Sequence, residues 1–269
     1  MDQKIINLFD EYTHKPLSRE VFLRRLTRLT GGTAAAMAVL PLLEVNYAHA
    51  GTVPESDEDI LTEVISYTGQ DCTMQGYLAR PARSDKKLGS VVVIHENRGL
   101  NPHTQDIARR LAKAGYMALA PNALAVFGGT PESDDEARAL IGKLDPQQNL
   151  QNFLKAFDYL RSQPEANGKS ACMGFCWGGA MANQLAVHAS DLQVAIPFYG
   201  RQAAAGDVAK IKAHVQLHYG ELDERVNAGI PEYEAALKAN GTSYELYVYA
   251  GAQHAFMNDA APTRFHEAS

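Results

Sequence analysis

The sequence predicts an α/β protein built on a mostly parallel sheet with helices on both faces. Short apolar runs rich in β-branched residues alternate with amphipathic segments, an order typical of parallel strands joined by right-handed crossover helices. The 269 residues are enough for one large domain with a substantial core. In such sheets, functional side chains gather in the loops that follow the carboxyl ends of the strands.

The predicted strands are short and bounded by turn residues. They cover Thr62–Tyr67, Cys72–Ala79, Ser90–Glu96, Tyr116–Pro121, Ser170–Gly174, Gln193–Gly200, His214–Gly220 and Tyr244–Gly251. The run "SVVVIHE" at Ser90–Glu96 is nearly continuous in β-branched residues, as expected of a strand buried on both faces. Between the strands, helices are predicted at Thr104–Gly115, Leu150–Ser162, Met181–His188 and Glu232–Ala239.

Composition and charge argue against several classes of protein. Hydrophobic residues make up 46% of the chain and charged residues 21%, which is ordinary for a globular protein. The net charge of −6, with no basic stripe, argues against nucleic acid as a partner. Three cysteines are too few, and too odd in number, for a disulfide scaffold.

Residues 1–50 resemble a twin-arginine export signal. The stretch "SREVFLR" is similar to the pattern S-R-R-x-F-L-K, with Glu20 in place of the second arginine. An uncharged run from Leu29 to Leu43 follows, too short to span a bilayer comfortably, and "AHA" at Ala48–Ala50 resembles a cleavage site. One interpretation of this pattern is a periplasmic protein. The alternative is a cytoplasmic protein whose N-terminal amphipathic helix packs on the main domain or on a partner chain.

The remaining chain divides into an acidic linker at residues 51–61, beginning "GTVPESDED", and a main domain at residues 62–269 with a short C-terminus. Few residues follow the last predicted strand, so one face of the sheet is expected to expose apolar side chains. Such exposure would favour association or instability.

The segment "GFCWGG" follows the strand Ser170–Gly174 and opens a helix. It matches the G-x-nucleophile-x-G turn of α/β-hydrolases, with Cys176 in place of serine. Side chains at Gly174 and Gly178 would collide with neighbouring backbone in so tight a turn. The helix N-terminus favours the thiolate of Cys176. Cys172 lies inside the strand, which predicts a core residue rather than a redox partner.

A thiol nucleophile needs a base, and the base needs an acid that orients it. Asp223 follows the strand His214–Gly220, and His254 follows the last strand, which gives the chain order Cys, Asp, His used by α/β-hydrolases. His254 lies in the loop directly after the last strand, so it is favoured as the base. The competitors are Glu221 and Glu224 for the acid, and His95, His214, His218 and His266 for the base.

The segment "VIHENRGLNPH" occupies the loop after Ser90–Glu96, where α/β-hydrolases supply part of an oxyanion hole. The predicted donors are the backbone N–H groups of Asn97 and Trp177. Glu96 and Arg98 have the alternative role of a plain solvated ion pair. No metal site is predicted, because His95 and Glu96 come without a third ligand.

Four segments, "HENRGLN", "GFCWGG", "YGELD" and "AQHAF", together resemble the dienelactone hydrolase family from about Thr62 to Asn258. The resemblance implies an α/β-hydrolase domain that cleaves a carboxylic ester or lactone through an acyl-enzyme, without a cofactor. The triad would be Cys176, Asp223 and His254. Glu96 would bond the resting thiol and release it when substrate binds.

One position departs from the family. Dienelactone-specific members carry an arginine where this chain has Asn258, so neutral esters or lactones are expected to react at least as well as carboxylate-bearing ones. The expected partner is a small-molecule ester or lactone, with no nucleic acid and no stable membrane span; homo-oligomerisation stays open. The alternative function is a catalytically inactive family member that acts as a binding module.

Overall fold

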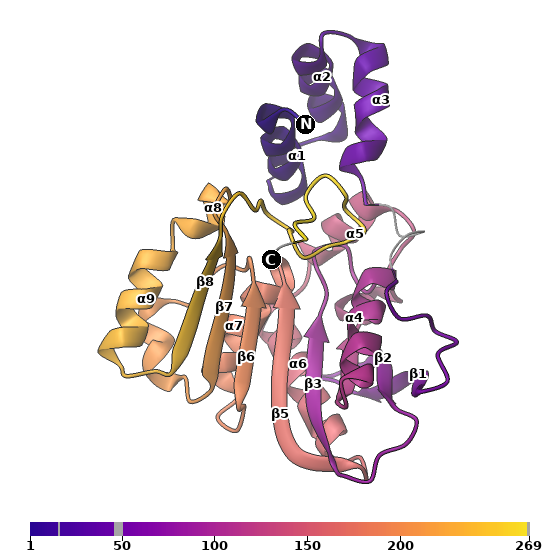
Figure 1. Cartoon of the computed structure of the whole chain (residues 1–269), viewed down its shortest axis with the longest axis vertical. Helices are drawn as coiled ribbons and strands as arrows, with labels where there is room; N and C mark the ends of the chain where they lie inside the picture. Colours follow the sequence, from indigo (N-terminus) through magenta and orange to yellow (C-terminus); the bar gives the residue numbers. More distant parts are fainter. Residues whose placement is uncertain (16, 46–50, 268–269) are drawn as a thin grey trace.

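The computed structural model describes residues 1–15, 17–45 and 51–267. Its centre is an eight-stranded sheet in the order β1-β2-β4-β3-β5-β6-β7-β8 (Figure 1). The strands are β1 Ile60–Thr68, β2 Thr73–Pro81, β3 Leu88–Ile94, β4 Met117–Pro121, β5 Ala166–Phe175, β6 Val194–Phe198, β7 His214–Gly220 and β8 Tyr244–Tyr249. Only the pairings that involve β2 are antiparallel. The predicted α/β class with a mostly parallel sheet is confirmed.

Helices cover both faces of this sheet. The α-helices after β3 are α4 Pro102–Lys113, α5 Asp134–Ile141, α6 Pro146–Arg161, α7 Trp177–His188, α8 Glu224–Asn227 and α9 Ile230–Ala239, and the 3₁₀ helices are η2 Ala123–Phe127 and η3 Ala205–Lys210. The side chains of Asn101 and Asp145 cap α4 and α6, each just before a proline in the first turn, where a missing N–H costs nothing.

The two faces of the sheet carry separate cores. Val92 and Ile94 of β3 pack in the core shared with α6, α7 and α9, whereas Val91 and Val93 pack in the core shared with α4. This alternation follows from the period of two along a strand. It explains why "VVVI" has no polar break: both sets of side chains are buried.

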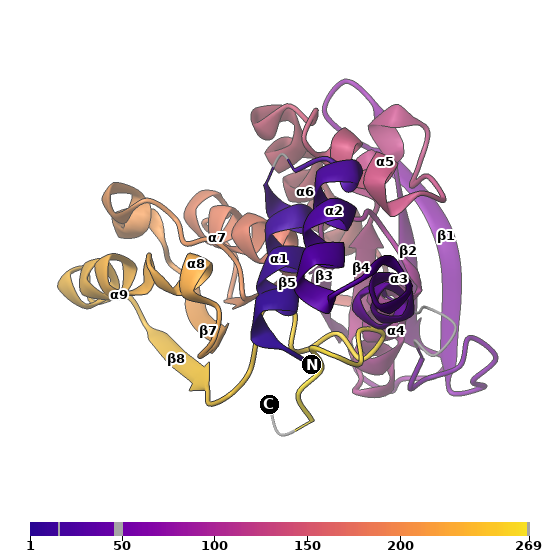
Figure 2. The ribbon, with the colours of Figure 1, turned by 90° about the horizontal axis from the view of Figure 1, so that it is seen from above.

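Three further helices precede the sheet: α1 Gln3–His14, α2 Arg19–Thr30 and α3 Thr33–Leu43. They share a core of their own that includes Phe9, Phe22 and Leu26, and the rings of Tyr12 and Phe22 stack with centroids 4.4 Å apart. In Figure 1 they lie beyond the carboxyl ends of the strands, and Figure 2 shows α1 crossing above β3 and β5. The N-terminal helices therefore stand over the edge of the sheet where functional side chains are expected.

Polar contacts hold these helices to the main domain. Asn97 Nδ2 donates to the carbonyl of Thr13 at 2.8 Å, and Thr263 Oγ1 donates to the carbonyl of Leu42 at 3.1 Å. Arg225 pairs with Asp10 at 3.3 Å. The predicted cleavage site at 48–50 lies outside the described residues, and the assignment of residues 1–50 as an export signal stays a prediction.

No single helix among the described residues has the length and apolar character needed to cross a membrane. Within the described ranges, the pair α2 and α3 taken together meets that criterion of length and composition, and the two helices are bent by 113° where they meet.

The segment before β1 packs on the main domain, and the last strand of the sheet, β8, is partly exposed. Within the stretch predicted as an acidic linker, the N–H of buried Val53 donates to Asp106 Oδ1 at 2.9 Å, and its carbonyl accepts from Arg109 Nε at 2.6 Å. At the other end, Tyr247 and Val248 of β8 are 41% and 49% exposed. The association that this exposure favours stays a prediction.

Candidate active site

The turn between β5 and α7 holds Cys176 in a conformation that few residues adopt. Its φ of 56° and ψ of −111° lie outside the regions favoured by L-residues. A Cβ at Gly174 would stand 2.0 Å from the carbonyl oxygen of Gly178, and a Cβ at Gly178 would stand 2.4 Å from that of Ile94. Both glycines are therefore required by close backbone approach. The turn places Cys176, a residue that is 8% exposed, at the N-terminus of α7.

Asp223 and His254 meet beside this turn. His254 Nδ1 lies 2.5 Å from Asp223 Oδ2, and both residues are buried. Burial alone would lower the pKa of His254, but the charges of Cys176 and Asp223 outweigh it and raise that pKa to about 9. Because Nδ1 faces the carboxylate, Nε2 is the ring nitrogen left for the thiol.

The competing histidines have other partners. His95 is fully buried, with Nδ1 at 2.6 Å from the carbonyl of Glu96 and Nε2 accepting from the N–H of Ala123. Burial lowers the pKa of His95 to about 4 and that of His218 to about 4, which favours neutral rings. His218 stacks on Phe198, and His214 bonds Ser243 Oγ.

The competing carboxylates also lie elsewhere. Glu221 Oε2 accepts the N–H of Gly251 at 2.7 Å, and Glu224 begins helix α8. Among the three acids of this loop, Asp223 is the one that the structure brings to His254.

A residue outside the predicted set also reaches the thiol. His14, the last residue of α1, places Nε2 at 3.1 Å from Cys176 Sγ, and its ring meets that of His254 edge to face with centroids 4.6 Å apart. No local pattern marked His14, because it belongs to a segment whose arginines and apolar run are typical of an export signal. Only the docking of α1 onto the sheet brings it to the site.

Glu96 has a different set of contacts from the one implied by the family resemblance. Its carboxylate accepts a hydrogen bond from Asn258 Nδ2 at 3.1 Å and one from Tyr199 OH at 3.5 Å, and Arg98 lies 3.7 Å away. Burial would raise the pKa of Glu96, but the charges of Arg98 and Arg264 outweigh it and lower that pKa. In this structure the hydrogen-bond partner of the thiol is His14 Nε2, and a role for Glu96 in regulating the thiol stays a prediction.

The predicted oxyanion donors flank the same space. Trp177 directly follows Cys176 and opens α7, and its indole stacks on the ring of His95 at 5.3 Å. Asn97 lines the cavity and uses its side chain to bind the carbonyl of Thr13. The oxyanion role of their backbone N–H groups stays a prediction.

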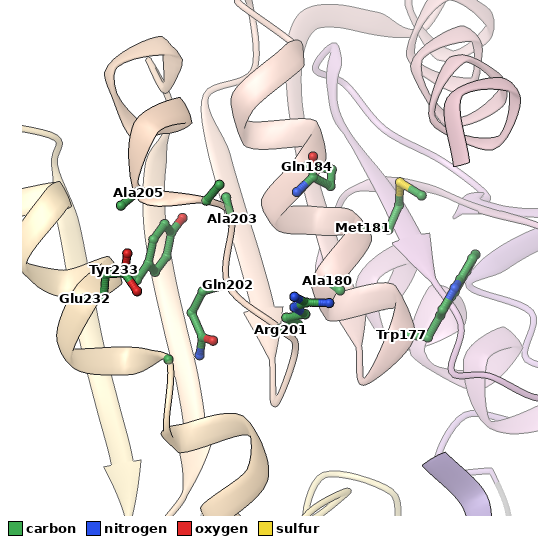
Figure 3. Close-up of a pocket in the computed structure, with 12 residues that line it drawn as sticks. Trp177, Ala180, Met181, Gln184, Arg201, Gln202, Ala203, Ala205, Glu232 and Tyr233 are labelled. Atoms are coloured by element: carbon green, nitrogen blue, oxygen red, sulfur yellow. The ribbon is translucent and has the colours of Figure 1, made fainter. Parts of the chain in front are cut away.

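A cavity of about 790 Å³ opens above the thiol, and Cys176 and His254 lie in its wall together with α1 residues. In the described part of the chain its basic lining residues are Lys15, Arg19, Arg138, Lys143, Arg201 and Arg225, and its acidic lining residue is Asp135. A neighbouring cavity of about 620 Å³ shares Trp177, Ala180 and Arg201 with it. In Figure 3, Arg201 lies beside Ala180, between Trp177 on one side and Gln202 on the other.

Cys172 provides a matched test of thiol environment. It is fully buried in β5, and burial raises the pKa of its thiol to about 12. We expect iodoacetamide to leave Cys172 unlabelled until the protein unfolds, while Cys176 reacts in the folded protein; peptide mapping by mass spectrometry distinguishes the two. Cys172→Ser should retain activity but lose about 1–3 kcal/mol of unfolding free energy, because a hydroxyl replaces a buried thiol. Labelling of Cys172 as fast as Cys176 would contradict this assignment.

The sheet order, the glycine-framed turn after β5 and the Asp223–His254 pair define an α/β-hydrolase. Residues 74–269 match the family model described as "Dienelactone hydrolase family". The chain belongs to the dienelactone hydrolase family and is a hydrolase of that type. The fold class and family predicted from the sequence are thereby confirmed.

Named relatives agree with this placement. The chain is 31% identical over 236 residues to an Escherichia coli O157:H7 protein named "Putative carboxymethylenebutenolidase", covering 82% of this chain and 86% of that one. It is 48% identical over 113 residues to "Putative hydrolase fragment YghX" of E. coli K12, covering 41% of this chain and 97% of that one. A crystal structure titled "Putative Dienelactone Hydrolase" from Klebsiella pneumoniae superposes with a TM-score of 0.71 at 27% identity, over 78% of this chain and 92% of that one.

Proposed function

We propose that this hydrolase cleaves carboxylic esters or lactones through Cys176 as nucleophile. The observation that carries the proposal is the thiol in its strained turn, facing the cavity, with the Asp223–His254 pair beside it. A buried histidine oriented by a carboxylate, next to a thiol at a helix N-terminus, is the arrangement that activates cysteine nucleophiles.

The reaction would run in two halves. The proton of the Cys176 thiol passes to His254 Nε2, and Sγ attacks the carbonyl carbon of the ester. The carbonyl oxygen takes up negative charge next to the backbone N–H groups of Asn97 and Trp177. The alkoxide leaves with the proton from His254 and a thioester remains. Water, deprotonated by His254, then releases the acid and restores the thiol.

The pKa of His254 fits this sequence of steps. At about 9 it favours an imidazolium at neutral pH, and an imidazolium beside Cys176 stabilises the thiolate that attacks. His14 Nε2 occupies the space next to Sγ in the resting structure, so substrate must take the place of that hydrogen bond.

The side chains of the cavity revise the expected substrate class. Asn258 is fully buried and binds Glu96, so it does not face the cavity as a substrate contact. Basic residues instead dominate the cavity lining, and Arg201 is exposed there. We therefore favour a substrate that carries a carboxylate or another anionic group, in place of the preference for neutral substrates expected from position 258.

Substitution of Arg201 tests this substrate class. Arg201→Gln should lower kcat/KM for a carboxylate-bearing aryl ester roughly 5-fold more than for its neutral isostere, as expected for about 1 kcal/mol at an exposed cation. The preference of the unmodified protein for the anionic ester should also weaken as ionic strength rises. Equal losses on both esters, with no effect of salt, would show that the cavity charge does not select the substrate.

The activity itself is tested with a panel of p-nitrophenyl esters and small lactones on the full chain, in the presence of a chelator. We expect the protein to hydrolyse some of these esters and iodoacetamide to abolish the activity. Substrate should protect the protein from this inactivation. A folded protein that binds such esters without hydrolysing any of them would support the alternative, a catalytically inactive binding module.

A further inference from the structure

Three soft or borderline ligand groups converge in the cavity from three separate parts of the chain. They are His14 at the end of α1, Cys176 in the turn after β5, and His254 after β8. A ring nitrogen of each histidine and the sulfur of Cys176 all lie within 4.8 Å of one another. The proposed hydrolysis uses Cys176 and His254 but assigns no chemistry to His14.

An aspartate faces Nδ1 of each histidine. His14 Nδ1 donates to the backbone carbonyl of Asp10 at 2.9 Å and lies 3.0 Å from its Oδ1, and His254 Nδ1 lies 2.5 Å from Asp223 Oδ2. In both histidines Nε2 is the nitrogen left for a ligand, and His14 Nε2 lies 3.1 Å from Cys176 Sγ. Buried His254 Nε2 makes no hydrogen bond among the described residues. A carboxylate that holds the far nitrogen of a ligating histidine is a recurrent feature of protein zinc sites.

The spacing fits a thiophilic ion with little rearrangement. Zinc bound by one thiolate and two imidazoles takes bond lengths that place its tetrahedral ligand atoms roughly 3.3–3.6 Å apart. The contact between His14 and Cys176 is already near that range, and no separation among the three atoms exceeds 4.8 Å, so a shift of about 1 Å suffices.

Beneath the basic wall of the cavity, the charged groups in contact with the three ligands carry a net negative charge, which suits a divalent cation. The Cys176 thiolate and the carboxylates of Asp10 and Asp223 supply three negative charges around the site. Arg225, which pairs with Asp10 at 3.3 Å, supplies a positive one. With a zinc ion in place the cluster would be electrically neutral, so burial of the ion carries a small electrostatic cost.

We propose that His14, Cys176 and His254 form a zinc site that reversibly blocks the nucleophile. Zinc replaces the thiol proton, which passes to solvent, and the ion bridges Sγ and the two Nε2 atoms with its fourth position open to the cavity. The metal would occupy the electron pair of Cys176 Sγ that is needed for attack and the electron pair of His254 Nε2 that is needed for proton transfer. It would also fasten α1 over the site, so the N-terminal helices would contribute directly to inhibition.

The test measures metal binding separately from hydrolysis. The full chain is stripped with a chelator and titrated with Zn²⁺ against a competing chromophoric chelator, and with Co²⁺ as a spectroscopic probe. We expect one Zn²⁺ per chain, a thiolate-to-cobalt absorption band, and esterase inhibition reversed by EDTA. These binding measurements do not require turnover. A protein that binds zinc but hydrolyses nothing would therefore contradict the proposed function and still support the zinc site.

Variants decide whether His14 is a ligand. His14→Ala should weaken zinc binding at least about 100-fold, since loss of outer hydrogen-bond partners alone typically costs 10–100-fold. Asp10→Asn should weaken it about 10-fold and carries the test if His14→Ala fails to fold. His188→Ala removes an exposed imidazole at the far end of α7 and should have no effect. The inhibition of each variant by zinc is expressed relative to the esterase activity of the same variant in the presence of chelator. Unchanged zinc affinity in both His14→Ala and Asp10→Asn, or a cobalt complex without the thiolate band, would overturn the proposal.

Discussion

Replacing Cys176 with alanine is expected to lower kcat/KM for ester hydrolysis by about 10⁵–10⁶-fold, the scale of loss when a hydrolase nucleophile is removed. The expected loss is large because no other described thiol lines the cavity: Cys172 is buried in β5, and Cys72 lies near Asn152. Steady-state kinetics on a p-nitrophenyl ester measures the change.

Cys172→Ala is the matched control for loss of a thiol. It should keep kcat/KM within a few-fold while lowering the melting temperature, because it opens a small cavity in the core. If Cys176→Ala retained a tenth or more of the activity, the nucleophile would have to be another group.

Asp223→Asn is expected to lower kcat/KM by about 10⁴-fold near neutral pH, as when an amide holds a catalytic histidine in the wrong tautomer. Asp223 Oδ2 accepts from His254 Nδ1 at 2.5 Å, and an amide NH₂ in its place would donate instead. Glu221→Gln is the control, because Glu221 is an acid of the same loop that bonds the N–H of Gly251. A larger loss in Glu221→Gln than in Asp223→Asn would contradict the assignment.

The same substitution should move the alkaline limb of the pH profile. Burial opposes the imidazolium of His254, but the charges of Cys176 and Asp223 raise its pKa to about 9, above the ordinary value of 6.5. The contribution of that proton to the stability of the folded state is therefore complete below about pH 6.5 and is lost as pH rises through about 9. Loss of the Asp223 charge should shift the alkaline fall in activity to lower pH. An unchanged alkaline limb would indicate that another group sets it.

The strands and the turn at Cys176 could be predicted because their signals are local. A β-branched run such as Ser90–Ile94 identifies a buried strand, and two glycines that flank a nucleophile identify a turn which tolerates no Cβ. The placement of Asp223 and His254 in loops after strands also follows from the order of elements, since parallel strands bring their carboxyl ends to one edge of the sheet.

The positions of His14 and Arg201 could not be predicted in this way. The amphipathic helix α1 contains no signal for where it docks, so the 3.1 Å contact between His14 and Cys176 depends on tertiary packing alone. Arg201 follows β6 but belongs to no recognised pattern, and its part in the cavity depends on the path of the loop beside α7. The surroundings of Asn258 could not be predicted either: its position matches a substrate contact of the family, whereas its side chain is fully buried and donates to Glu96. The preference for neutral substrates expected from that position stays a prediction.

The most direct test of the central claim is to trap the acyl-enzyme. The full chain is mixed with p-nitrophenyl acetate, quenched in acid within the first turnovers, and analysed by intact mass and peptide mapping. Nucleophilic attack by Cys176 predicts one acetyl group per chain, carried by the peptide that contains Cys176 and released by hydroxylamine, with none in Cys176→Ala. Turnover without an acetyl group on Cys176, or an acetyl group on another residue that forms at the rate of turnover, would contradict the account.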